Sequence, residues 1–414
     1  MSRGPFWARS SGWAHALVVA LAVVGCSDRA APAVVDTPYE GMAFPRAAPS
    51  FTLPDGPYAL VSNNGSDDLS VVDATTHTTL AHVPIGLNPV DRDGPHHLAV
   101  DALRGHVFVA LAYPQPTLAL GPHAAHGSGT RGGKLVRLDL PGLTRSGEAR
   151  TDDNPGDIVL SEDGARLVVS HYDLRRAVTL ATQGLEARRA TLLSFRADAI
   201  AEVTPATASV SIPICIAPHG VVLDRPHGDR AYAACYGEDA VAIVDFTTSP
   251  PSVERVPVGP AAGPPGLPAY GPYALTLSPD GTFILVGDTE GKDLRRFDTP
   301  TRAMSEASFA AGGAVYFSAI REDGVAFVPV QAPDRLVRVR LSTMTAERSR
   351  SFLGDECRAP HEAVLRANGD VLLVCEGDHQ KPSHVLVLDP DSLETTHSWD
   401  VGVYPDKVVV VGDR

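Results

Sequence analysis

The feature of this sequence that most constrains its fold is a pattern that returns seven times along the chain. Each copy has a Pro or Gly, a short alternating apolar run, a turn that contains Gly or Asp, and a second apolar run. In one copy these parts are Pro272 to Leu277, Ser278 to Gly281 and Phe283 to Val286. Turn dipeptides such as Asp-Gly between apolar runs of period two mark β-hairpins. No comparable amphipathic helix lies between the copies, so the pattern disfavours parallel-sheet folds.

The length of the repeat distinguishes between the all-β folds. The second apolar runs begin near residues 107, 167, 231, 283, 325 and 371, and an additional first copy begins at Tyr58. Four short strands per unit of roughly 50 residues are typical of a β-propeller, in which radial closure removes exposed sheet edges. The last run, Val408 to Val411, has no strands of its own after it, and Tyr58 to Val61 has none before it. We therefore predict an all-β, seven-bladed β-propeller of four-stranded antiparallel blades, closed by pairing of the N- and C-terminal strands.

One unit of the repeat is specific enough to compare with known families. It comprises Leu60 to Asp73, Val83 to Gly86 and Pro89, and it resembles the repeat of the YVTN-type β-propeller family. The turn from Ser278 to Gly281 matches the same repeat further on, whereas the units near residues 107 and 167 are degenerate and carry insertions. The resemblance implies a secreted or surface propeller over residues 56–414. The family includes lactonase-like relatives, but the resemblance implies no particular reaction.

The N-terminal segment has the pattern of an export signal. Arg3 and Arg9 form a basic leader, and Ala14 to Val24 is a mostly apolar run that is too short to span a bilayer stably. The run ends in Gly25-Cys26, which resembles a bacterial lipoprotein box, where the cysteine is lipidated and becomes the new N-terminus. The alternative is an ordinary signal peptide in which a cysteine stands here by chance.

These features divide the chain into a signal peptide (1–25), a lipidated tether (26–55) and the propeller (56–414). We expect the lipid bilayer to be a partner through acylated Cys26, which anchors the protein without making it span the membrane. Ser27 rather than Asp follows this cysteine, and by resemblance to sorting in Gram-negative bacteria this favours the outer membrane, on its periplasmic or surface face. The formal net charge of −14, without a basic stripe, argues against nucleic acid as a partner.

The four remaining cysteines allow three disulfide pairings. Cys215 to His219 and Cys357 to His361 have nearly the same sequence, and in each copy a second cysteine, Cys235 or Cys375, ends the second apolar run. In a hairpin of the innermost strands those ends meet. We predict the bonds 215–235 and 357–375, which fit an exported, oxidising compartment. The alternative, a thiolate metal site, is opposed by the absence of close Cys-x2-Cys spacing.

The residue after the repeat proline opens the innermost strand of each blade, where the chain converges on the central channel. This position holds His96, Gly156, His219, Tyr273, Ala314, His361 and Asp406. The sequence predicts that these side chains face one end of the channel, with His97 beside the first histidine. Loops that follow the second strands would bring further histidines to the same end, namely His171, His379, His123 and His126.

Two interpretations of these histidines stay open. Neutral imidazoles that converge from rigid strands are good ligands for copper, zinc or iron, so His96, His219 and His361, with His97 and His171 as further members, form a metal-site hypothesis. The alternative is that Pro-His is a frequent variant of the repeat turn, and that each imidazole packs against a neighbouring blade.

The leading functional hypothesis is an envelope propeller that binds an envelope protein or a small ligand through its loop-rich, histidine-bearing face. The alternatives are enzymes. One is an oxidoreductase that depends on copper or another divalent metal at His96, His219 and His361. The other is a lactone hydrolase like some propeller relatives, for which no catalytic residues can be matched one by one. The sequence leaves open whether the protein is an enzyme.

Overall fold

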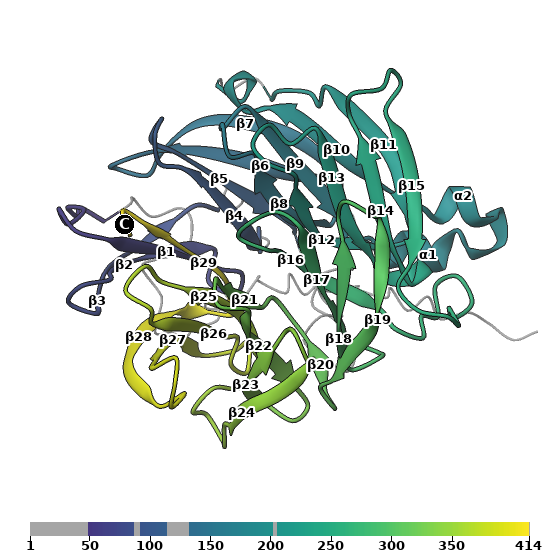
Figure 1. Cartoon of the computed structure of the whole chain (residues 1–414). Coiled ribbons are helices and arrows are strands. Elements are labelled where there is room, and N and C mark those ends of the chain that lie inside the picture. The colour runs from purple at the N-terminus through teal and green to yellow at the C-terminus, as the bar shows by residue number, and fades with distance from the viewer. Residues whose placement is uncertain (1–48, 87–91, 114–131, 202–204, 414) are drawn as a thin grey trace, which may run out of the picture. The chain divides into compact units, whose positions relative to one another are not determined.

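The computed structural model describes residues 49–86, 92–113, 132–201 and 205–413. These residues belong to one compact unit, 39–414. They form six antiparallel sheets of four strands and one of five, and these sheets are the blades of a seven-bladed β-propeller, as predicted (Figure 1). Three residues named in the sequence analysis lie outside the described residues, namely the predicted lipidation site Cys26, His123 and His126.

The blades follow one another along the chain. From the channel outward, the first blade contains β29 (Pro405–Val411), β1 (Tyr58–Asn63), β2 (Asp68–Asp73) and β3 (Thr78–Pro84). The second contains β4 (Pro95–Asp101), β5 (His106–Leu111), β6 (Gly132–Asp139) and β7 (Thr144–Asp153). The third contains β8 (Pro155–Leu160), β9 (Arg166–His171), β10 (Ala190–Arg196) and β11 (Val210–Cys215).

The remaining four blades have the same order, with the innermost strand first. The fourth contains β12 (Pro218–Leu223), β13 (Arg230–Cys235), β14 (Ala240–Asp245) and β15 (Ser252–Pro257). The fifth contains β16 (Pro272–Leu277), β17 (Phe283–Asp288), β18 (Asp293–Asp298) and β19 (Ala303–Ala310). The sixth contains β20 (Ala314–Val315) and β21 (Ala319–Arg321), then β22 (Val325–Gln331), β23 (Arg335–Arg340) and β24 (Thr345–Ser351). The seventh contains β25 (Pro360–Leu365), β26 (Val371–Cys375), β27 (Pro382–Leu388) and β28 (Thr395–Val403).

Helices are few and short in the described part of the chain. An insertion between β9 and β10 forms α1 (Leu174–Thr179), η2 (Ala181–Gln183) and α2 (Leu185–Arg188), and single 3₁₀ turns lie at η3 (Ala197–Ala199) and η4 (Tyr236–Glu238). None of the described helices has the length and apolar character needed to cross a membrane.

The two ends of the propeller chain pair with each other. β29 lies antiparallel to β1, with Ala59 opposite Val410 and Val61 opposite Val408, and Figure 1 shows the C-terminus beside β1. This confirms the predicted closure. Without β29, the polar backbone groups on one edge of β1 would lose their partners, which is the aggregation-prone state that a closed ring avoids.

Hydrophobic side chains fill the space between neighbouring blades. In one cluster, Leu60 and Val71 of the first blade pack with Val107 and Val136 of the second. Because a blade is covered on both faces, its inner strands are nearly continuous apolar runs, as in β1 and β22, where every residue is buried. The outermost strands face solvent, and β24 exposes most of its residues.

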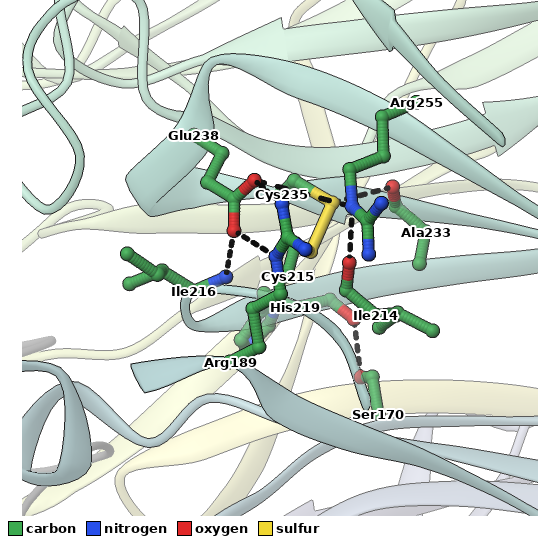
Figure 2. Close-up of a disulfide and its surroundings, with 10 residues drawn as sticks. All are labelled: Ser170, Arg189, Ile214, Cys215, Ile216, His219, Ala233, Cys235, Glu238 and Arg255. Carbon is green, nitrogen blue, oxygen red and sulfur yellow. Dashed lines mark hydrogen bonds and ion pairs between the residues drawn. A yellow bond between two sulfur atoms is a disulfide. The ribbon is translucent and has the colours of Figure 1, made fainter. Parts of the chain in front are cut away.

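Both predicted disulfides are present. Cys215 at the end of β11 is bonded to Cys235 at the end of β13, with the Cα atoms 5.7 Å apart, so this bond ties the third blade to the fourth (Figure 2). Cys357, which precedes β25, is bonded to Cys375 at the end of β26, with the Cα atoms 5.1 Å apart. Each bond therefore fixes the chain just before an innermost strand begins.

We predict that removing either disulfide destabilises the propeller. The Cys215→Ser, Cys235→Ser pair and the Cys357→Ser, Cys375→Ser pair should each lower the free energy of unfolding by about 2–4 kcal/mol, because the bond constrains the unfolded chain. Urea titration followed by circular dichroism measures this. Unfolding midpoints equal to that of the unsubstituted protein would contradict the prediction.

Candidate metal centre

The innermost strands all begin at one end of the channel. In six blades the proline that starts the innermost strand lies opposite the last residue of the second strand: Pro95 and Leu111, Pro155 and His171, Pro218 and Cys235, Pro272 and Asp288, Pro360 and Cys375, and Pro405 and Asn63. Neighbouring innermost strands contact one another, β4 with β8, β8 with β12, β12 with β16, and β29 with both β25 and β4. The loops after the second strands therefore lie at the same end as these prolines.

Strand irregularities turn the residues after the prolines into the channel. The β-ladder shifts register between Pro95 and Leu98 and between Pro218 and Val221, with the equivalent shift in the third, fifth and seventh blades. A bulge breaks the strict alternation of side chains and re-aims them. For this reason the consecutive residues His96 and His97 both contact His219, which comes from another blade.

Four buried histidines and one aspartate meet in two overlapping groups. Ligand atoms of His96, His97 and His219 all lie within 4.8 Å of one another, and so do those of His97, His361 and Asp406. None of these five residues is more than 1% exposed. The structure thus brings the predicted residues His96 and His219 into one group and places His361 in the other. His97, which the sequence put only beside the first histidine, belongs to both groups.

Hydrogen bonds orient three of the imidazoles in the same way. The Nδ1 atom of His96 lies 2.5 Å from Asp406 Oδ2, that of His97 lies 2.5 Å from Asp157 Oδ1, and that of His361 lies 2.9 Å from the Asp406 carbonyl oxygen. A carbonyl or an ionised carboxylate only accepts, so each Nδ1 donates its hydrogen and each Nε2 keeps a lone pair. Metal-binding histidines have this arrangement, in which the far nitrogen is held by a carboxylate or a carbonyl.

The Nε2 atoms are placed as ligands of one ion would be. His96 Nε2 lies 3.3 Å from His219 Nε2. Two nitrogens that each lie about 2.0–2.1 Å from one tetrahedral ion are about 3.3 Å apart. His97 Nε2 is buried and has no hydrogen-bond partner among the residues that the structure describes. A buried polar atom without a partner is costly, and a bound ion would satisfy it.

The electrostatics of the groups also suit a cation. Burial, with the neighbouring His96, lowers the pKa of His97 well below 6.5, and burial, with His97 and His96, does the same for the pKa of His219. These imidazoles are therefore neutral at pH 7, as a metal ligand must be. Burial acts to raise the pKa of Asp406, but the adjacent His96 outweighs it and keeps that pKa below its ordinary value. The aspartate is therefore ionised.

Packing fixes the positions of these side chains. His219 stacks on Tyr273 with the ring centres 3.7 Å apart, and His97 meets the ring of Phe317 at 5.3 Å. The Ser62 hydroxyl donates to the carbonyl oxygen of His96, and the Ser170 hydroxyl donates to that of His219, as Figure 2 shows for the second pair. A serine on the second strand of the preceding blade thus holds each histidine in the same manner.

The disulfide beside His219 belongs to a larger polar support. Glu238 accepts two hydrogen bonds from the Arg189 guanidinium, at 2.9 and 3.0 Å, and one from the Ile216 backbone nitrogen at 3.0 Å (Figure 2). Arg189 follows α2, so the insertion is tied to the segment that leads into β12. That segment carries the Cys215–Cys235 bond, and His219 is the second residue of the strand that follows.

The other end of the channel is an open cavity of about 490 Å³. Its walls are the later residues of the innermost strands, such as Leu98 and Leu275, and its lining includes Asp157, Phe317, Glu362 and Lys407. The Lys407 ammonium donates to Glu362 Oε1 at 2.9 Å and lies 5.3 Å from the centre of the Phe317 ring. Since Asp157 and Phe317 also contact His97, these residues separate the cavity from the histidines.

Two expected histidines take other places. His171 Nδ1 donates to the Thr191 carbonyl oxygen at 2.8 Å, and within the described residues it belongs to neither ligand group. His379 lies in the loop after β26, where it stacks on Tyr404 at 3.5 Å and its Nε2 lies 3.1 Å from Glu376 Oε2.

The sixth blade differs from the sequence alignment of the repeats. Ala314 lies opposite Gln331, which is the place that the prolines occupy in other blades. The innermost strand is then interrupted between β20 and β21, and Tyr316 and Phe317 in this gap contact His361 at ring distances of 5.3 and 5.5 Å. The expectation that Ala314 faces the histidines is therefore wrong, because the broken strand presents two aromatic residues in its place.

Sequence reasoning missed several charged residues around the site. Asp157, Glu362 and Lys407 each stand two positions after a repeat proline, as His97 does. This second position is titratable in four of the seven units, which was the signal available in the sequence. Strict alternation would place such residues on the face of the strand that points away from the histidines. The pattern therefore cannot be interpreted until the bulges are known. Glu376 follows the second cysteine of its unit and had no comparable signal.

Comparison with known proteins supports the architecture. No family model and no curated protein matches the chain. The chain is similar to a putative 6-phosphogluconolactonase from Bacteroides uniformis, with a TM-score of 0.62 and 15% identity over 86% of this chain and 100% of that one. It is similar to the Pseudomonas aeruginosa periplasmic gluconolactonase PpgL, with a TM-score of 0.58 and 18% identity over 87% and 100%. It is also similar to the dihydro-heme d1 dehydrogenase NirN, with a TM-score of 0.53 and 13% identity over 88% and 77%. At these identities the similarity shows the propeller fold alone.

We predict that the ion-free protein loses stability between pH 7 and pH 5.5. The unfolded chain protonates His97 and His219 below about pH 6.5, whereas their lowered pKa values keep them neutral in the folded state, so the unfolded state binds more protons. Each imidazole lowers the free energy of unfolding by at most about 1.4 kcal/mol per pH unit. The two together lower it by about 2–3 kcal/mol between pH 7 and pH 5.5. Urea titrations in chelator measure this loss.

The control is the double variant His97→Gln, His219→Gln, whose stability should depend much less on pH over the same interval. A free energy of unfolding that is unchanged between pH 7 and pH 5.5 in the unsubstituted protein would refute the assignment of two buried neutral imidazoles.

Proposed function

We propose that this protein is an exported propeller that binds one divalent transition-metal ion, copper or zinc, in its channel. The observation that carries the proposal is the 3.3 Å separation of His96 Nε2 and His219 Nε2, beside the buried Nε2 of His97, which has no hydrogen-bond partner in the part of the chain that the structure describes. Packing of a frequent turn variant accounts less well for this arrangement. The imidazoles of His96 and His219 can share one hydrogen bond at this distance, but the buried Nε2 of His97 has no partner within the described residues, which is unfavourable, and an ion bound among the three nitrogens would remove that cost.

The donor set suits copper and zinc. Neutral imidazole is a common ligand for both, and the order of divalent affinities rises to copper and stays high for zinc. The carboxylate of Asp406 supplies negative charge, and it also holds His96 from behind. All four cysteines within the described residues are in disulfides, so thiolate does not contribute to this site.

The same geometry favours binding over turnover. The five residues of the two ligand groups are at most 1% exposed, and aromatic side chains close around them. A substrate of a metal-dependent oxidoreductase must reach the ion, whereas the described residues bury all five of these side chains. The small ligand of the histidine-bearing face is, on this proposal, the ion itself.

We propose that the protein works in the bacterial cell envelope, attached to the outer membrane through acylated Cys26. The two disulfides fit an oxidising compartment, and the periplasmic gluconolactonase among the similar structures supports the same location. Metabolic labelling with a radioactive fatty acid tests the attachment, since Cys26→Ala should abolish the label and release the protein from the membrane fraction. A label that persists in this variant would refute it.

We predict that the purified full-length protein takes up one equivalent of Zn²⁺ or Cu²⁺, measured by equilibrium dialysis and elemental analysis. His97→Ala and His219→Ala should each weaken binding by more than about 100-fold, since loss of even the groups behind a ligand costs about 10–100-fold. Asp406→Asn should weaken binding by about 10–100-fold. The matched control is His227→Ala, because that exposed histidine pairs with Asp163 far from these groups and should bind as before.

The absence of uptake of either metal would refute the proposed function. Equal binding by the control and by His219→Ala would place the ion elsewhere and would refute the assigned site.

Lactone hydrolysis is a second candidate function. It is supported by the names of two similar structures and by Asp157, which lines the 490 Å³ cavity and is paired with His97 behind it. The test is hydrolysis of gluconolactone and of its 6-phosphate. If this candidate is right, the unsubstituted protein accelerates hydrolysis and Asp157→Asn does not. A rate equal to the buffer rate with the unsubstituted protein excludes the candidate.

A further inference from the structure

A buried carboxylate outside the two ligand groups lies between two imidazoles. Glu376 is fully buried, its Oε2 lies 3.1 Å from His379 Nε2, and its Oε1 lies 3.8 Å from His361 Nε2. Burying a carboxylate is costly unless it is paired. If Glu376 served only to fix the loop after β26, its contact with His379 would be sufficient. The carboxylate also faces His361 on its other side.

These residues continue into the ligand groups without a gap. His361 Nδ1 lies 3.7 Å from Asp406 Oδ1, and both residues share a group with His97, which in turn shares a group with His96 and His219. Each step from one nitrogen or oxygen atom to the next is therefore shorter than 5 Å. The side chain of His379 is 21% exposed, whereas every later residue of the series is buried. The series thus leads from the surface to the channel.

The opposite end of the channel holds an ion pair and an aromatic ring. Lys407 lines the cavity there and lies 5.3 Å from the centre of the Phe317 ring. The Lys407 ammonium donates to Glu362 Oε1 at 2.9 Å, so the two groups form an ion pair. A divalent cation that approached through the cavity would have to pass this ion pair and the Phe317 ring, whereas the series that begins at His379 offers a ligand atom at each step.

We infer that the metal ion is loaded and released along His379, Glu376 and His361, on the loop-bearing face of the propeller. This inference rests on the proposed function, because it describes how the ion reaches that same site. The three residues would act in turn as temporary ligands, and each step replaces one nitrogen or oxygen ligand by the next. No bond other than a metal–ligand bond forms or breaks, and the ion keeps its charge.

The test compares rates with equilibrium affinity, using the full-length protein and Zn²⁺ or Cu²⁺ alone. Glu376→Gln and His379→Gln should each slow both metal uptake and chelator-driven release by at least tenfold, measured by stopped flow. The equilibrium affinity should change much less than either rate, because the final ligands are retained. A purely structural role would instead lower stability and leave the rates per folded molecule unchanged. His227→Gln is the matched control, as an exposed histidine outside the series.

The outcomes separate the two proposals. If the unsubstituted protein binds no ion at equilibrium, the proposed function is wrong. If it binds one ion and His379→Gln loads and releases it at the unsubstituted rate, the function stands and the route is wrong. Faster uptake by Lys407→Met, with no effect of Glu376→Gln, would move the route to the cavity. His379 is partly exposed, so its variant tests the inference even if Glu376→Gln fails to fold.

Discussion

The pairing of β29 with β1 is the constraint on which the rest of the structure depends. It joins segments more than 300 residues apart and turns a row of hairpin sheets into a ring with one axis. Only in a closed ring do the starts of the innermost strands face one another. The contact between His96 and Asp406, which are 310 residues apart in the sequence, exists because of that pairing. The hydrophobic clusters between blades then fix the distances across the channel.

In the closed ring, the stability of the histidine cluster depends on how each buried imidazole and carboxylate is hydrogen-bonded. Burial disfavours the charged form of an imidazole. It also destabilises a carboxylate unless the carboxylate accepts hydrogen bonds. Asp157 meets this need by accepting from the backbone nitrogens of Ile158 and Val221 as well as facing His97. The aspartates are thus anchored in the sheets and in turn orient the rings. The same contacts that stabilise the charges also direct the Nε2 atoms inward.

The sequence was sufficient for the architecture and for part of the site. The closed propeller was predicted from the seven repeats, their length and the unpaired terminal runs. Both disulfides were predicted from the Cys-x-x-Pro-His motif, which occurs twice. Equivalent positions identified His96, His219 and His361. The role of His97 could not be found in this way, because period-two alternation assigns neighbours to opposite faces and only the bulge after Pro95 overrides it. The break in the sixth blade, which brings Phe317 to the channel, likewise leaves no mark in the repeat pattern.

The position of Asp406 on the closing strand has a consequence for biogenesis. A ribosome makes this residue after His96, His97, His219 and His361, so a chain that is still being synthesised holds the imidazoles without the carboxylate and without the ring that gathers them. The five side chains of the two ligand groups therefore come together only once the whole propeller has closed. Under the proposed function, an exported protein of this kind would take its ion from the compartment in which the ring closes.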